Sequence, residues 1–162
     1  MANDERWMDA LAEKQATRLV EDANDEERQR QEARDTQVAI DNDLPALKSR
    51  LGEAAQRETE RFKEKMGFGA ELACLYHPAG MIEVTWAKNM GATLAIQVEM
   101  SSMRIKAEAT HRDMPTNVGL PSASVRVSGR HLNLYMGGEI VSPEDVISRL
   151  LRPFFEFLVN DA

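Results

Sequence analysis

The sequence predicts an α+β protein with two N-terminal helices, an antiparallel sheet (a meander) of about six strands, and a C-terminal helix packed on one sheet face. Three observations lead to this fold class. Apolar and polar residues alternate with a period of two between Glu71 and Met136, as in strands with one buried face. Residues 3–40 have the composition of a helix, without Pro or Gly. A strong helix-start signal lies at Ser142.

The N-terminal helix has an apolar stripe that ends partway along it. The stripe recurs at helical spacing and consists of Trp7, Met8, Leu11, Ala12, Ala16, Leu19, Val20 and Ala23. From residue 24 to 37, Ala33 is the only apolar side chain. Such a polar helix is either solvated or frayed, or it is an arm that reaches another subunit. The competing arrangement packs the stripe beside the second helix of its own chain.

A helix boundary is predicted at residues 41–45. Asp43 or Leu44 is suited to cap a second helix, and Pro45 is tolerated in a first helical turn. The second helix ends at Gly67. Its apolar face, predicted to cover the sheet, consists of Leu47, Leu51, Ala54, Ala55, Phe62 and Met66.

Two turns set the register of the first strands. A turn over residues 77–81, with Pro78 and Gly80 in suitable positions, pairs Leu72 with Trp86. A second turn at residues 89–91 pairs Trp86 with Leu94. Both registers place the large apolar side chains on the same face.

Two further turns extend this face. A tight turn at residues 101–102 sets Glu99 across from Arg104, a favourable charge pair. A turn at Gly129 and Arg130 pairs Val127 with Leu132. The residues predicted to be buried together on one face are Ile82, Val84, Trp86, Ile96, Val98, Ile105, Val127 and Leu134.

The rest of the chain supplies a long connection and a final helix. The connection over residues 110–121 is either functional or an ordinary link between parts of the sheet. Residues 137–138, both Gly, are expected to release the chain from its last strand. Ser142 then caps a helix with Asp145 in a capping box, and Pro153 is expected to kink or divide that helix.

Composition limits the partners. The chain has 162 residues and a formal net charge of −7, which suits a helical extension or arm over residues 1–40 and an α+β globular domain over 41–162. An acidic protein is a poor partner for nucleic acid or an anionic membrane. The sequence lacks an apolar run of about 18 residues and a signal-peptide pattern. Its single cysteine, Cys74, is compatible with the cytoplasm.

No residues are assigned to catalysis, cofactor binding or metal binding. The three histidines, His77, His111 and His131, fall at strand ends that the predicted strand order keeps apart. Nucleophile and phosphate-binding motifs are not found in the sequence. Cys74 lies in an alternating strand and is interpreted as a small buried apolar residue.

Two classes of function remain. The first is a non-catalytic binding or assembly protein, a homo-oligomer or a partner of another protein. It would use its N-terminal helix, with Trp7, Leu11, Leu19 and Val20 as the candidate interface, or an uncovered surface of the sheet. The second is a small-molecule-binding protein or enzyme. Its pocket would lie between sheet and helices, lined by Tyr76, Trp86 and Tyr135 or covered by residues 112–120. A filled core favours the first class, and a hollow with convergent polar groups favours the second.

Overall fold

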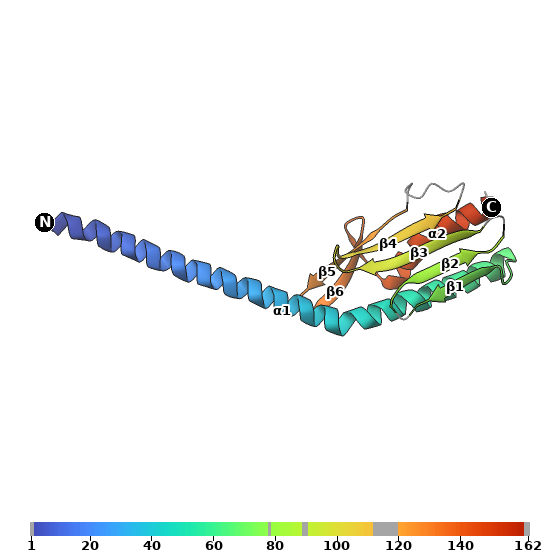
Figure 1. Ribbon diagram of the computed structural model, residues 1–162, viewed down its shortest axis with the longest axis horizontal. Helices are drawn as coiled ribbons and strands as arrows, with labels where there is room; N and C mark the ends of the chain where they lie inside the picture. Colours follow the sequence, from blue (N-terminus) through green and yellow to red (C-terminus); the bar gives the residue numbers. More distant parts are fainter. Residues whose placement is uncertain (1, 78, 89–90, 112–119, 161–162) are drawn as a thin grey trace. The chain divides into compact units, whose positions relative to one another are not determined.

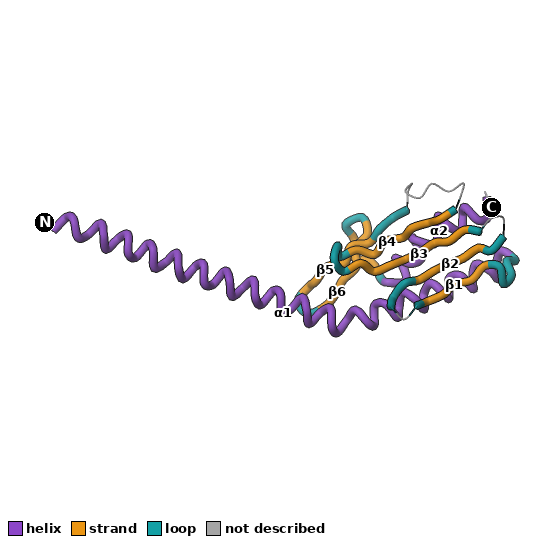
Figure 2. Tube along the Cα trace, viewed as in Figure 1, coloured by secondary structure: helices purple, strands orange, loops and turns teal. Residues whose placement is uncertain are grey.

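The computed structural model describes residues 2–77, 79–88, 91–111 and 120–160. The chain divides into two compact units, residues 1–38 and residues 39–162. We call the first unit the arm and the second the globular domain. The described elements are a long helix, seven strands and a second helix, in that order (Figures 1 and 2).

Helix α1 (Ala2–Met66) is continuous, so the prediction of two N-terminal helices is wrong. Pro45 lies inside the helix, where a proline lacks the main-chain N–H and costs about 3 kcal/mol. Contacts with the rest of the domain on either side of Pro45 offset this cost. The Asp43 carboxylate, predicted as a cap, instead accepts a hydrogen bond from the Leu132 main-chain N–H at 2.8 Å. One turn beyond Asp43, Leu47 is buried.

The seven strands form one antiparallel sheet in which the spatial order follows the chain. The α+β class and the antiparallel meander are therefore confirmed, with seven strands in place of six. The strands are β1 (Leu72–Tyr76), β2 (Ile82–Trp86), β3 (Ala92–Glu99), β4 (Arg104–Thr110), β5 (Ala123–Ser128), β6 (His131–Met136) and β7 (Glu139–Val141).

The seventh strand corrects the prediction for residues 137–138. Gly137 and Gly138 do not release the chain: Met136 pairs with Glu139 directly across them. Both glycines have positive φ, 59° and 82°, which is the backbone geometry that a two-residue hairpin turn requires. In this sequence the two glycines between the apolar segments of β6 and β7 therefore indicate a hairpin turn.

Three of the four predicted registers are confirmed. Leu72 pairs with Trp86, Glu99 with Arg104, and Val127 with Leu132. In the first turn the His77 amide donates to the Met81 carbonyl at 2.9 Å, as the predicted pairing requires. Pro78, on which that prediction partly depended, lies outside the described residues.

The fourth register is wrong by two residues. Trp86 pairs with Ala92, not with Leu94. The Gly91 amide donates to the Lys88 carbonyl at 3.0 Å, so the chain reverses earlier than predicted. Asn89 and Met90 lie outside the described residues. Because the error is an even number of residues, it leaves every side chain on its predicted face.

The domain has two layers. The second half of α1 and helix α2 (Pro143–Asn160) cover the same face of the sheet (Figure 2). The two helices run in the same direction, because Arg50 contacts Glu144 at one end and Phe62 stacks on Phe155 further along. Side chains from both helices and the sheet form one continuous core.

The predicted buried face lies within this core. Six of its members are buried, namely Ile82, Val84, Trp86, Ile96, Ile105 and Leu134. Val98 and Val127 are half-buried, and Val98 packs against the core. The register argument therefore identified the correct face.

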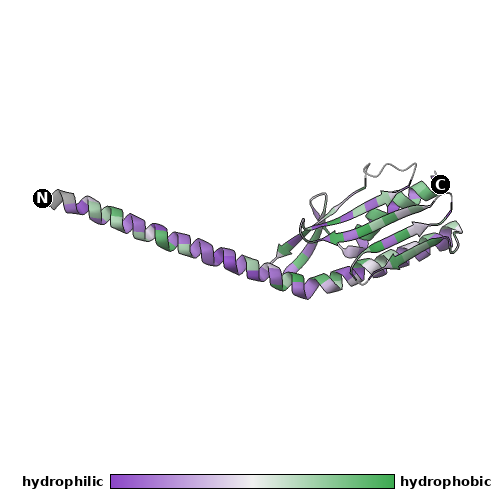
Figure 3. Cartoon of the chain, in the orientation of Figure 1, coloured by the Kyte–Doolittle hydropathy of each residue, from purple (hydrophilic) through white to green (hydrophobic). Residues whose placement is uncertain are grey.

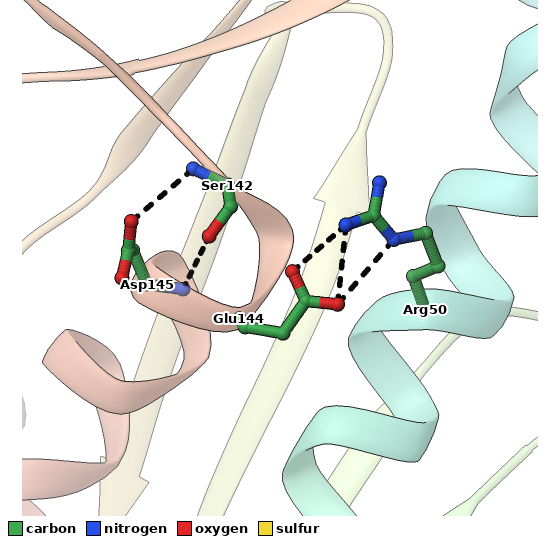
Figure 4. A network of polar contacts seen from close by, with 4 residues as sticks. All are labelled: Arg50, Ser142, Glu144 and Asp145. Atoms are coloured by element: carbon green, nitrogen blue, oxygen red, sulfur yellow. Dashed lines mark hydrogen bonds and ion pairs between the residues drawn. The ribbon is translucent and has the colours of Figure 1, made fainter.

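The start of α2 confirms the predicted capping box (Figure 4). The Asp145 amide donates to Ser142 Oγ at 3.1 Å, and the Ser142 amide donates to Asp145 Oδ2 at 3.5 Å. Glu144, in the same turn, forms an ion pair with Arg50 of α1 at 2.9 Å. The helix then continues through Pro153 to Asn160, so Pro153 does not divide it.

Candidate functional site

The four predicted interface residues are all exposed on the arm. Trp7 is 53% exposed, Leu11 54%, Leu19 61% and Val20 59%. At about 100° per residue, Trp7, Leu11 and Leu19 lie within about 120° of one another around α1, together with Met8, which is 52% exposed, and Val20 lies about 100° beyond Leu19. Figure 3 shows apolar bands along this leading half of the arm and a mostly hydrophilic stretch after it. The exposed large apolar side chains are therefore a candidate interaction surface.

The trailing half of the arm is held together by local polar contacts. Arg28 pairs with Asp25, Arg30 with Glu26 at 3.8 Å, and Gln31 donates to Asp35 at 3.1 Å. Contacts three or four residues apart support a helix by only about 0.2–0.5 kcal/mol each. The side chains of this half are polar and can remain in contact with water.

The three candidate pocket residues are not brought together. The Tyr76 ring lies against α1, so close to Gly52 that a Cβ on that glycine would be 2.7 Å from it. Trp86 is buried, and its ring is nearly perpendicular to that of Phe68, with the ring centroids 4.9 Å apart. Tyr135 points to the opposite sheet face from the core residue Leu134, and the Arg126 guanidinium lies over its ring at 4.4 Å.

A hollow of about 380 Å³ lies where α1 meets β6 and β7. Its lining includes Asp43 and Arg50 beside Leu132 and Ile140. Both charged side chains already have partners: Asp43 accepts from the Leu132 amide, and Arg50 is bound to Glu144. This hollow lies at the rim of the domain, and its charged groups are used to hold α1 and α2 in place.

A second hollow, of about 350 Å³, lies between α1 and α2 on the domain surface. Phe62 and Phe155 stack at its base with ring centroids 4.1 Å apart. Met66 and Val159 also line it and are 56% and 51% exposed. The sequence identified the apolar face of each helix, but not that two adjacent faces leave a groove between them. We call it the helix groove.

The single cysteine and the three histidines each have identified surroundings. Burial raises the pKa of the Cys74 thiol to about 11, so the thiol is neutral near pH 7. His77 lies 3.5 Å from Glu83, His131 lies 3.3 Å from Asp43, and His111 packs against Phe157. Each histidine therefore has a separate environment.

Neither a metal cluster nor a membrane-spanning helix is found in the described part of the chain. No three His, Cys, Asp or Glu side chains there are grouped to hold a metal ion. None of its helices combines the length and apolarity needed to cross a bilayer. Residues 112–119, predicted as a possible pocket cover, lie outside the described residues. Comparison of the chain with protein-family models, curated proteins and solved structures finds no match.

Proposed function

We propose that the protein is a cytoplasmic, non-catalytic assembly protein whose copies associate through the arm. The observation that carries this proposal is the exposed apolar stripe formed by Trp7, Leu11, Leu19 and Val20. Apolar surface left in water costs about 25 cal/mol per Å². A partner that buries the stripe recovers this free energy.

The division of the arm into two halves supports association with a separate chain. The trailing half, residues 24–37, has Ala33 as its only apolar side chain and carries local ion pairs. It offers little that would pack against a protein core. An arm with an apolar leading half and a polar trailing half is suited to bury its leading half on another subunit. A second copy is the simplest partner because it is always present.

The alternative is a small-molecule-binding protein or an enzyme. That function needs a pocket with convergent polar groups. The space between sheet and helices is filled by side chains such as Leu51, Trp86 and Phe154. Around the rim, the charged residues Asp43 and Arg50 are paired within the chain. The filled core favours the assembly function.

Alanine substitution of the stripe tests the proposal in the full chain. We expect the native chain to have the mass of a dimer or larger at tens of micromolar. The variant Trp7→Ala/Leu11→Ala/Leu19→Ala/Val20→Ala is expected to be monomeric. Alanine is the best helix former, so the variant retains its helix. Sedimentation velocity or light scattering measures the mass.

A matched control replaces four exposed residues of the trailing half. Glu27, Gln29, Glu32 and Arg34 are all exposed, and their replacement by alanine is expected to leave the mass unchanged. A native chain that is monomeric at tens of micromolar would contradict the proposal. So would a stripe variant that assembles as well as the native chain.

Tryptophan fluorescence provides an independent readout. The chain has two tryptophans, and Trp86→Phe leaves Trp7 as the only one. Trp86 Nε1 is buried without a hydrogen-bond partner among the described residues, so this substitution loses no hydrogen bond. We expect Trp7 emission to shift to shorter wavelength as protein concentration rises, since assembly removes Trp7 from water.

A further inference from the structure

The helix groove is a second exposed apolar surface, and it lies within the globular domain. α1 and α2 run in the same direction along it, with the stacked rings of Phe62 and Phe155 at the base. Met66 on α1 and Val159 on α2 are more than half exposed beside these rings. A groove between two helices with an apolar base is a common docking site for a third, amphipathic helix.

Most of the exposed large apolar side chains in the described residues belong to two surfaces. Trp7, Met8, Leu11, Leu19 and Val20 are on the arm, and Met66 and Val159 are in the helix groove. The remaining two, Leu75 and Ile140, lie on separate strands. One surface is a convex helix and the other is a concave groove, so the two have complementary forms.

We propose that the helix groove of one copy receives the leading half of the arm of a second copy. This inference rests on the proposed function and names the surface that the arm binds. The stripe from Trp7 to Val20 is about 20 Å long at the helical rise. The groove-lining residues extend over about 18 Å on α2, from Ser148 to Asn160, and over about 12 Å on α1, from Glu58 to Met66. The α2 wall is therefore nearly as long as the stripe.

Charges at the borders of the two surfaces are complementary as well. At about 100° per residue, Asp9, Glu13 and Arg6 fall at the stripe border near Val20, and Lys14, Arg18 and Glu21 fall at the border near Trp7. One border therefore has a net negative charge and the other has a net positive charge.

The two walls of the groove also differ in charge. Glu58 on the α1 wall pairs with Arg61 at 3.5 Å, and Arg61 and Lys65 line the adjoining hollow beside that wall, so this side has a net positive charge. On the α2 wall Glu156 pairs with Arg152, so this side is neutral. A helix can lie in the groove in two directions. One of them sets the negatively charged border beside Arg61 and Lys65, and the other sets the positively charged border there, so charge favours the first direction.

Complementation between two full-length variants tests the inference. The arm variant is Trp7→Glu/Leu11→Glu, and the groove variant is Met66→Glu/Val159→Glu. Each alone is expected to be monomeric, because a carboxylate in an apolar contact is strongly unfavourable. An equal mixture is expected to form a complex with one copy of each, since it contains one intact arm and one intact groove. Native mass spectrometry identifies that composition.

The outcomes separate this inference from the proposed function. A groove variant that assembles like the native chain would overturn the inference and leave arm-to-arm pairing as the mode of assembly. An arm variant that assembles normally would overturn the proposed function itself. If both variants are monomeric and their mixture stays monomeric, the inference fails.

Two controls keep the test independent of folding. The matched variant Leu75→Glu/Ile140→Glu places the same charges on the two exposed apolar residues outside both surfaces. It is expected to assemble normally. Circular dichroism and thermal unfolding establish that each variant retains the native fold.

A charge-reversal pair tests the proposed direction with changes confined to the surface. Arg61→Glu/Lys65→Glu is expected to weaken assembly about tenfold. Adding Asp9→Lys/Glu13→Lys to the same chain is expected to restore it. A reversal that has no effect, or that the second pair does not rescue, would overturn the assigned direction and its docking site.

Discussion

The two parts of α1 show how one helical pattern can lead to opposite outcomes. In the globular domain Leu51 and Ala54 are each 1% exposed. In the arm Leu11 is 54% exposed and Leu19 is 61% exposed. All four residues lie at helical spacing on an apolar face. The difference is that the domain segment of α1 packs against the sheet and α2. An apolar helix face therefore indicates a contact, but it does not identify the surface that the face contacts.

The polar contacts of the arm and of the globular domain also differ, because those of the arm are local and those of the domain are not. Those of the arm are local, as between Arg30 and Glu26, and they stabilise only the helix that contains them. Those of the domain join distant parts of the chain. Asp43 accepts from the Leu132 amide, and Arg50 binds Glu144 at the start of α2. Substitutions in the domain should therefore change folding, and substitutions in the arm should change assembly.

The two tryptophans provide the largest contrast. Trp86 is 6% exposed and packs nearly perpendicular to the Phe68 ring. We expect Trp86→Ala to lower the free energy of unfolding by about 3–5 kcal/mol, the usual cost of removing a large core side chain. Trp7→Ala should leave the unfolding free energy of the domain unchanged at a concentration where the protein is monomeric. Urea unfolding, followed by circular dichroism, measures both.

One outcome would contradict this contrast between Trp86 and Trp7. If both alanine variants lowered the stability of the monomer by several kcal/mol, Trp7 would be packed within its own chain. That is the competing arrangement, in which the stripe lies beside the domain segment of α1. The proposed assembly function would then lose its main support.

A smaller effect is expected at Gly52, where α1 lies against β1. A Cβ at this position would be 2.7 Å from the Tyr76 ring, so either the ring or the helix must move. Overpacking costs about 1–3 kcal/mol, and the better helix propensity of alanine returns about 1 kcal/mol. We expect Gly52→Ala to destabilise the domain by about 1 kcal/mol in urea unfolding.

The arm offers a matched substitution without this contact. Gln15→Ala on the exposed arm is expected to leave the domain stability unchanged. In a Tyr76→Ala background the cost of Gly52→Ala should disappear, because the ring that crowds the Cβ has been removed. If the cost were the same in that background, the close approach of Tyr76 would not be its cause.

Much of the fold could be predicted because its signals are local. Alternation and turn chemistry identified the sheet face on which Ile82 and Val84 are buried, and the capping box at Ser142 was visible in sequence. The errors have tertiary causes. Pro45 fits a helix start by local rules, and the hydrogen bond between Asp43 and Leu132 is a tertiary contact that the sequence does not reveal. Gly137 and Gly138 resemble the end of a sheet because the strand that follows them, β7, has only three residues.

The candidate site was predictable only in part. The sequence identified the apolar stripe of Trp7 and Leu11, and both residues are exposed in the structure. The helix groove could not be predicted, because it depends on how far apart α1 and α2 lie on the sheet. Sequence placed Phe62 on one helix and Phe155 on another, and only the structure shows their rings in contact.

The smallest expected effect is at the ion pair between Arg50 and Glu144 (Figure 4). The pKa of Glu144 is below its ordinary value of 4.5, first because its own main-chain amide donates to it and then because Arg50 lies beside it. A carboxyl whose pKa is lower in the folded state adds stability above its unfolded pKa. That contribution is lost as the pH falls through the folded value. Both side chains are largely exposed, so the pair contributes at most about 1 kcal/mol.

We therefore expect Arg50→Ala to lower the unfolding free energy by about 0.2–1 kcal/mol at neutral pH, and the difference should shrink in 1 M salt. It should also vanish below the folded pKa of Glu144, where the carboxyl is neutral in both states. Arg30→Ala, which removes the arm pair with Glu26, is the matched control and should leave domain stability unchanged. Urea unfolding of both variants from neutral to acid pH measures these differences. If Arg50→Ala cost the same at every pH, the aliphatic part of Arg50 would be responsible and the ion pair would contribute nothing.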